Sequence, residues 1–368
     1  MPSYASKECD FPAIFNLGDS NSDTGALAAA FNWTPPPYGE TFFHKPVGRF
    51  SDGRLIIDFI ARSLGLPFLS AYLNSLGTNF TNGANFASAA ATIGPPEYII
   101  PVGGFSPFYL DVQYWQLKQF IYRSQILKKQ GGVYGDLMPM KEYFSKALYT
   151  MDIGQNDLGQ GFSSNRSIEE VNASVPDIVN SFSTHVKNIY GLGARTFWIH
   201  NTGPIGCLAY IFVNFPPNAD QMDSAGCAKP YNEVAQYFNY KLKKAIVQLR
   251  KDLPLAALTY VDIYSAKYSL FLEPEKYGFE LPLVTCCGLG GEYNYGNGDC
   301  GTTVTVNGSQ IFIGACKNPS TRIVWDGIHY TEAANKIIFD KISTGAFSDP
   351  PIPLKMACHS SPDKKQID

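Results

Sequence analysis

The chain has 368 residues, of which 45% are hydrophobic and 17% are charged, and its formal net charge is −3. This composition is typical of a globular protein with a sizeable core. The slightly negative charge and the lack of any basic block argue against nucleic acid as a partner. No apolar run is long enough to span a membrane.

The first predicted strand covers residues 11–15, and Gly18-Asp19-Ser20 follows it where the chain should turn toward a helix. In open α/β sheets, ligands bind at the carboxyl ends of the strands. A serine in that position can be a nucleophile if another segment supplies a base. Asp and Ser are also good N-caps, so this tripeptide alone fits a capped helix start equally well.

The rest of the chain alternates between helical and strand-like patterns. Helices are expected over residues 22–31, 54–64, 112–130, 141–148, 168–192, 231–251 and 332–342. Further strands are expected over residues 149–154, 195–200 and 258–263. We expect Pro176 to kink or break its helix and Thr331 to cap the last one. The alternation predicts one large α/β domain, residues 1–368, with a mostly parallel sheet covered by helices on both faces.

Two loop regions stand out. Residues 32–53 are rich in aromatic side chains and lie close in sequence to Ser20, so they either pack on one another or form a wall of a cleft. Residues 274–320 carry four cysteines and many glycines, which predicts an excursion pinned by disulfides.

The cysteines and the glycosylation motifs indicate the cellular compartment in which the protein works. The eight cysteines include no C-x-x-C pair, which favours disulfides over a zinc site and leaves their pairing open. Five N-x-S/T tripeptides are candidate glycosylation sites, at Asn32, Asn79, Asn165, Asn172 and Asn307. Residues 1–9 lack a signal-peptide core, which fits a cytosolic chain or a mature form. The cysteines and sequons favour a secreted or vacuolar glycoprotein.

A serine nucleophile also needs a base, a group that orients the base, and donors for the developing oxyanion. Of the five histidines, only His329 has a carboxylate, Asp326, three residues before it. The cases for the other four are weaker: His44, His185, His200 and His359. Gly83 and Asn156 occupy loop positions from which a backbone N–H and a side-chain amide could stabilise an oxyanion.

Four segments in this order resemble the conserved blocks of the GDSL (SGNH-hydrolase) esterase/lipase family, and their extended forms are similar to its secreted plant branch. They are Gly18-Asp19-Ser20, Gly83-Ala84-Asn85-Phe86-Ala87, Gly154-Gln155-Asn156-Asp157 and Asp326-Gly327-Ile328-His329. The resemblance covers about residues 9–358. It implies a three-layer α/β/α fold with a flavodoxin-like sheet and a hydrolase site that needs no metal or other cofactor.

The resemblance also implies a role for each matching residue. Ser20 would be the nucleophile, His329 the general base and then acid, and Asp326 the carboxylate that orients it. The Ser20 N–H, the Gly83 N–H and the Asn156 side chain would form the oxyanion hole. One departure is visible: residues 88–91 read Ser-Ala-Ala-Ala, where glycine-rich sequence is common in the family.

Three functions remain open at this point. The leading one is hydrolysis of a small-molecule carboxylic ester, such as an acylated metabolite, sugar or lipid, through an acyl-enzyme. The second is transfer of the acyl group to a bound alcohol, which shares the same acyl-enzyme. The third is an inactive binding protein. The acyl group, the alcohol and the oligomeric state are not specified by these motifs.

Overall fold

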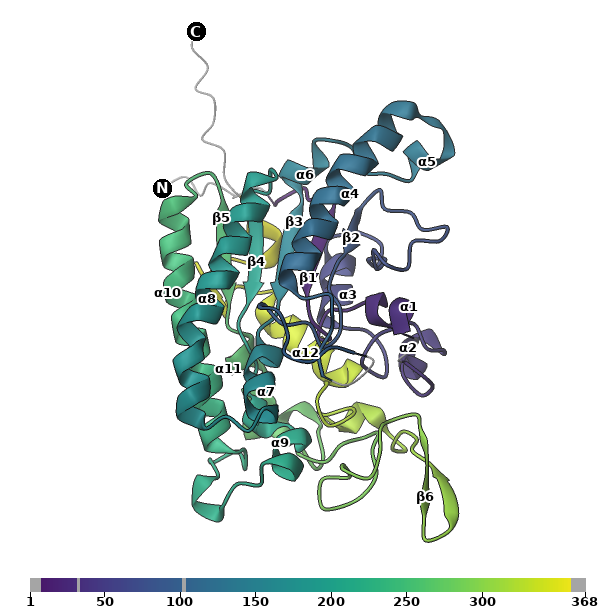
Figure 1. Cartoon of the computed structure of the whole chain (residues 1–368), viewed down its shortest axis with the longest axis vertical. Helices are drawn as coiled ribbons and strands as arrows, with labels where there is room; N and C mark the ends of the chain where they lie inside the picture. The colour runs from purple at the N-terminus through teal and green to yellow at the C-terminus, as the bar shows by residue number, and fades with distance from the viewer. Residues whose placement is uncertain (1–7, 32–33, 101–103, 359–368) are drawn as a thin grey trace.

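The fold is built on a six-stranded sheet, seen in the computed structural model, which describes residues 8–31, 34–100 and 104–358 (Figure 1). Its strands, in spatial order, are β2 (Gly83–Asn85), β1 (Ile14–Gly18), β3 (Leu148–Asp152), β4 (Thr196–His200), β5 (Ala257–Val261) and β8 (Ser348–Asp349). All neighbours run parallel except β8, which pairs antiparallel to β5. The order 2-1-3-4-5 is that of flavodoxin-like folds, as predicted.

The central strands are buried along their whole length, because helices cover both faces of the sheet. In one layer α8 (Ile168–Gly191) packs against both α4 (Leu110–Gln130) and α10 (Lys229–Asp252). In the other, α12 (Glu332–Ile342) packs against both α3 (Ile56–Ser63) and α11 (Ile263–Leu272). The predicted three-layer α/β/α architecture is therefore confirmed.

Shorter elements connect and extend these layers. They are α1 (Ala26–Phe31), α2 (Glu40–Phe43), α5 (Gly132–Asp136), α6 (Tyr143–Lys146), α7 (Gln155–Ser163), α9 (Ala209–Asn214) and the hairpin of β6 (Thr303–Val306) and β7 (Ser309–Phe312). Short 3₁₀ turns lie between several of them.

Several boundaries differ from the sequence-based expectation. The helix expected from residue 22 begins at Ala26, because Asp23 Oδ1 accepts hydrogen bonds from the Gly25 and Ala26 amides and caps the helix there. Pro176 does not break α8, whose buried face continues through Val175 and Val179. Helices α7 and α11 and the β6–β7 hairpin were not predicted, since none has a long amphipathic pattern.

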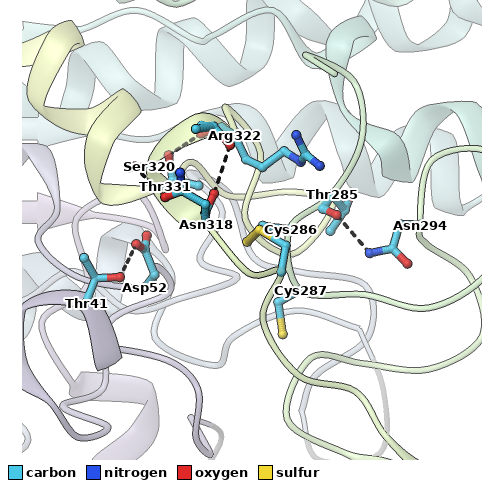
Figure 2. Close-up of a disulfide and its surroundings, with 12 residues drawn as sticks. Thr41, Asp52, Thr285, Cys286, Cys287, Asn294, Asn318, Ser320, Arg322 and Thr331 are labelled. Carbon is cyan, nitrogen blue, oxygen red and sulfur yellow. Dashed lines mark hydrogen bonds between the residues drawn. A yellow bond between two sulfur atoms is a disulfide. The ribbon is translucent and has the colours of Figure 1, made fainter. Parts of the chain in front are cut away.

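All eight cysteines are paired, which confirms the predicted disulfides. The pairs are Cys9–Cys358, Cys207–Cys227, Cys286–Cys316 and Cys287–Cys300. In Figure 2, Cys286 and Cys287 lie between the loop of Asn294 and the segment of Thr331. The Asn294 side-chain amide donates to the Thr285 carbonyl, and the Thr331 hydroxyl donates to the Arg322 carbonyl. The predicted excursion is therefore tied down beside the start of α12.

The described residues contain neither a candidate membrane-spanning helix nor a candidate metal-binding cluster. No helix there combines the length and apolarity needed to cross a membrane. No group of three or more His, Cys, Asp or Glu side chains within the same residues is arranged to hold a metal ion.

Candidate active site

Ser20 lies just beyond the carboxyl end of β1, where the strand order reverses between β1 and β3. In doubly wound sheets this switch point is where ligands bind. Gly18 pairs with Asp152 of β3, and the Asp19 amide donates to the Asp152 carbonyl over 3.0 Å. Ser20 is only 4% exposed. The turn that carries the serine is thus fixed to the end of the neighbouring strand.

Asn156 lies at the same edge of the sheet, in the first turn of α7, which directly follows β3. Its side-chain Nδ2 donates a 2.9 Å hydrogen bond to the Ala91 carbonyl. An amide nitrogen carries two hydrogens, so a second donor remains for a ligand. Asn156 is half-buried and lines a cavity of about 390 Å³.

Asp326 and His329 form an oriented pair on a tight loop before α12. His329 Nδ1 lies 2.7 Å from Asp326 Oδ2, and Asp326 Oδ1 also accepts from the backbone amides of Ile328 and His329. Burial alone would raise the pKa of Asp326, but the charge and hydrogen bonds of His329 outweigh it and hold that pKa below its usual value. Asp326 therefore stays ionised and leaves the other imidazole nitrogen of His329 available.

The aromatic loop supplies two further contacts that the sequence did not indicate. The Tyr38 hydroxyl donates a 2.8 Å hydrogen bond to Asp326 Oδ2, and the Phe50 ring lies 5.2 Å from the His329 ring, centre to centre. Two interpretations were left open for residues 32–53. Tyr38 and Phe50 fit the one in which this loop forms a wall of a cleft, because both line a cavity together with His329. Phe42 and Phe43 instead pack on each other.

The structure contradicts the assignment of Gly83 to the oxyanion hole. In the parallel register Gly83 pairs with Ile14, at the opposite end of β1 from Ser20. Its N–H already donates to the Phe80 carbonyl over 3.0 Å. A Cβ built at this position would lie 1.8 Å from the Ile14 carbonyl oxygen. Glycine is therefore required there for close packing of the strands and not for catalysis.

Ala90 is the candidate that the structure offers in place of Gly83. It lies in the residue 88–91 departure, lines the same cavity as Asn156, and has a φ of 60°. Left-handed backbone is unusual for alanine and normal for glycine. Among the described residues, neither the Ala90 N–H nor the Ser20 N–H takes part in a hydrogen bond. Both remain free to bind an oxyanion.

The other histidines have different surroundings. His200 is buried at the end of β4, with Nδ1 2.9 Å from Asp152 Oδ2. His185 is buried in α8, where burial lowers its pKa, and His44 bonds a backbone carbonyl on the surface. His359 lies outside the described residues.

A buried cluster of ionisable groups, formed by Lys267, Asp152 and Asp19, lies next to the site. Lys267 of α11 donates a 3.2 Å hydrogen bond to Asn21 Oδ1, and its ammonium lies 4.5 Å from the centre of the Tyr330 ring. It thus contacts residues next to both Ser20 and His329. Burial lowers the pKa of Lys267, against the attraction of Asp152 and Asp19. Nothing in the local sequence pattern marks this lysine, which comes from a helix that was not predicted.

The glycosylation candidates differ in exposure. Asn79, Asn165 and Asn307 are exposed, and Asn172 is half-buried in α8. Asn32 lies outside the described residues.

Comparison with known proteins places the chain in a family. The profile of the family described as GDSL-like Lipase/Acylhydrolase matches residues 14–342. The chain belongs to this family. It is 66% identical to an esterase of Hevea brasiliensis over 361 residues, covering 97% of this chain and 92% of the relative. It is 62% identical to the GDSL esterase/lipase ENOD8 of Medicago truncatula, with 97% and 92% covered. It is also 54% identical to the alpha-L-fucosidase 3 of Arabidopsis thaliana, with 94% and 93% covered.

These matches confirm the family, the enzyme class and the leading function that the sequence predicted. As a member of the GDSL family, the chain is a serine ester hydrolase, and the idea of an inactive binding protein is set aside. The acyltransferase alternative receives no specific support from these relatives.

Proposed function

We propose that this GDSL hydrolase cleaves its ester with Ser20 as nucleophile, His329 as base and acid, and Asp326 as the orienting carboxylate. The observation that carries the proposal is the 2.7 Å contact between His329 Nδ1 and Asp326 Oδ2. Asp326 stabilises the imidazolium that forms when His329 takes the Ser20 proton. Ser20 Oγ then attacks the ester carbonyl, the alcohol leaves with that proton, and water hydrolyses the acyl-enzyme.

The oxyanion of the tetrahedral intermediate would be bound by the Ser20 N–H, the Ala90 N–H and the free hydrogen of Asn156 Nδ2. Both amides are free, and Asn156 is held by its bond to Ala91, the neighbour of Ala90. Donors fixed before the reaction cost no reorganisation when charge develops, and each contributes about 3 kcal/mol in comparable sites.

Single substitutions test these roles. Ser20→Ala and Asp326→Asn should each lower kcat for a nitrophenyl ester by about a thousandfold or more, with an unchanged circular dichroism spectrum. Ser145→Ala, on the exposed surface of α6 before the amino end of β3 and so at the opposite end of that strand from the site, is the matched control and should keep full activity. A folded Ser20→Ala enzyme with normal turnover would overturn the assignment.

A glycosidase is the second candidate, because one relative is named alpha-L-fucosidase 3. Most glycosidases place two carboxyl groups on either side of the glycosidic bond. Asp326 is already engaged by His329 and Tyr38, so the ester hydrolase fits the site better. Nitrophenyl fucoside in the same assay separates the two, since its cleavage should be absent.

We also propose that the protein works outside the cytosol, in the extracellular space or the vacuole. Four disulfides and three exposed sequons support this location. The intact mass of the plant-made protein, before and after glycan removal, tests it: attached glycans and no free thiols are expected.

A further inference from the structure

Two cavities lie on either side of Ile328, the residue before the catalytic histidine. One, of about 390 Å³, is lined by Ala90, Asn156 and Ile328. The other, of about 490 Å³, is lined by Ile328, Asp326 and His329. An ester has two halves, an acyl group and an alcohol, and the molecule offers two cavities that share Ile328 as a wall.

The chemistry at the site decides which half enters which cavity. In the proposed mechanism the carbonyl oxygen must reach Asn156, whereas the alcohol oxygen must reach His329 to receive its proton. The cavity beside Asn156 is therefore on the acyl side, and the cavity beside His329 is on the alcohol side. We call them the acyl cavity and the alcohol cavity.

The acyl cavity is mostly apolar. Besides Ala90 and Asn156, its walls include the side chains of Phe105, Phe162, Ile205, Leu208 and Ile211. The hydroxyls of two further lining residues, Ser163 and Tyr210, hydrogen-bond to each other over 2.9 Å and so present little unpaired polarity. A hydrocarbon acyl group longer than acetyl would fill this space, and its chain would be removed from water.

The alcohol cavity is more polar than the acyl cavity, although apolar surface still forms most of its wall. Asp299, Thr302 and Tyr295 line it, and the Asp299 carboxylate has no hydrogen bond or ion pair in the part of the chain that the structure describes. Burial, and after it the nearby charges of Asp326 and Asp299, raises the pKa of the Tyr38 phenol. The unpaired Asp299 carboxylate and the Tyr295 hydroxyl suit a ligand with several hydroxyl groups, whereas the Thr302 hydroxyl already donates to the Asp299 carbonyl over 2.6 Å.

The aromatic residues of the alcohol cavity do not form an open cage for a cation. The Tyr38 and Phe50 rings pack edge to face, 5.9 Å apart between centres, and both are almost fully buried. A quaternary ammonium group needs accessible ring faces. The Tyr38 and Phe50 rings instead pack against each other, and they also contact the Trp325 and His329 rings, respectively. The charged group that this cavity leaves exposed is the Asp299 carboxylate, while Phe31, Pro35 and Ile328 supply half-exposed apolar surface beside it.

We infer that the natural substrate is an ester of a hydroxyl-rich, sugar-like alcohol with a hydrocarbon acyl group longer than acetyl. This inference rests on the proposed function. In the first step the Ser20 Oγ–acyl bond forms and the bond from the acyl carbon to the alcohol oxygen breaks. The Ser20 proton passes through His329 to that oxygen, and water then releases the acid.

Two glycine positions allow a clean test of the acyl cavity. Gly159 lines this cavity, and a Cβ added there would meet no atom within 4 Å. Gly159→Leu should therefore fill the cavity without straining α7. Gly191→Leu, at the exposed end of α8 and equally free of contacts, is the matched control.

The acyl test compares methyl glucoside 6-acetate with the 6-hexanoate. In the unmodified enzyme kcat/KM should be at least about tenfold higher for the hexanoate, because four buried methylenes are added. Gly159→Leu should lower the hexanoate-to-acetate ratio at least about tenfold, and Gly191→Leu should leave it unchanged. An enzyme that prefers acetate, or a ratio insensitive to Gly159→Leu, would overturn the acyl assignment.

The alcohol test compares methyl glucoside 6-hexanoate with cyclohexylmethyl hexanoate, which has a ring of similar size and no hydroxyls. The sugar ester should react at least about tenfold faster, and Asp299→Ala should lower that preference. Asp220→Ala, an exposed carboxylate outside the cavity, should not. Equal rates for the two esters, or fastest cleavage of hexanoylcholine, would overturn the sugar assignment.

Nitrophenyl acetate separates this inference from the proposed function. If Ser20-dependent hydrolysis of nitrophenyl acetate is normal while the preferences are missing, only the substrate inference fails. If nitrophenyl acetate and the sugar esters all resist cleavage, or are cleaved without Ser20, the proposed function fails and the inference fails with it.

Discussion

The hydroxyl of Tyr38 donates a 2.8 Å hydrogen bond to Oδ2 of Asp326, across 288 positions of sequence. The same oxygen lies 2.7 Å from His329 Nδ1. Tyr38 thereby fixes the carboxylate that orients the His329 imidazole in the proposed mechanism. It joins the aromatic loop after α1 to the loop before α12, and both loops contribute residues to the alcohol cavity.

Removing this hydroxyl should weaken catalysis without unfolding the enzyme. A hydrogen bond to a charged group contributes about 1.5–3 kcal/mol, so Tyr38→Phe should lower kcat/KM for nitrophenyl acetate about tenfold or more. Tyr122→Phe, on the exposed surface of α4, is the control and should have no effect. Unchanged kinetics in Tyr38→Phe would mean that Asp326 is held well enough by its backbone donors alone.

Ala90 offers a test of the oxyanion loop through its backbone. With φ at 60°, alanine is strained by about 1–2 kcal/mol, and glycine would relieve that strain at a smaller cost in chain entropy. Ala90→Gly should therefore keep activity and equal or exceed the parent in urea stability. Ala90→Val should lose both activity and stability, because β-branched residues disfavour this backbone most. Full activity in Ala90→Val would contradict a left-handed, catalytic Ala90.

Asp19 should make stability depend on pH. Burial, together with the charge of Asp152, raises the pKa of Asp19 from 3.8 to about 7. Between these values the folded chain holds a proton that the unfolded chain has lost, so the free energy of unfolding falls as pH rises. Below pH 3.8 both states are protonated and the effect vanishes.

Asp19→Asn removes this titration. Relative to the parent, the variant should become more stable from pH 4 to pH 7.5, by at most about 4 kcal/mol, as measured by urea unfolding. Asp220→Asn, at an exposed position, should show no such trend. A difference between Asp19→Asn and the parent that is constant with pH would show that Asp19 is ionised throughout.

The disulfide Cys287–Cys300 should matter for activity as well as for stability. Cys300 lines the alcohol cavity, and the Cys287 amide donates to the Trp325 carbonyl over 2.6 Å, directly before Asp326. Replacing both cysteines by serine should lower the free energy of unfolding by about 3 kcal/mol and also lower kcat.

The pair Cys9–Cys358 gives the matched control, because it lies before the amino end of β1, away from Ser20. Its double serine variant should lose stability but keep the kcat of the folded enzyme. The comparison of kcat in the two variants, below their unfolding temperatures, checks the prediction. Equal kcat values in both variants would contradict the prediction that the Cys287–Cys300 disulfide affects activity by positioning Asp326.

The parts of the site that sequence could predict are local. Ser20 follows a strand and a glycine, and Asp326 lies three residues before His329, so a short motif specifies each. The oxyanion donor could not be placed this way. Gly83 and Ala90 lie in one small-residue segment, and only the pairing of Gly83 with Ile14 shows that Gly83 is at the wrong end of β1 to serve Ser20.

The remaining contacts depend on tertiary structure. Lys267 and Asn21 are 246 positions apart, and the sheet order brings them together beneath the site. The helix α11 that carries Lys267 is apolar on most sides and buried, so its sequence has no amphipathic period to reveal it. The three-layer fold itself was predictable, because alternating strands and helices leave few other arrangements.

The most direct test of the central claim is covalent labelling of the intact enzyme with a fluorophosphonate, followed by peptide mass spectrometry. We predict one adduct per chain, on Ser20, formed together with complete loss of esterase activity. His329→Ala should slow the labelling strongly, since the serine then has no base. An adduct on another residue, or full activity after Ser20 is labelled, would contradict the assignment of Ser20 as the nucleophile.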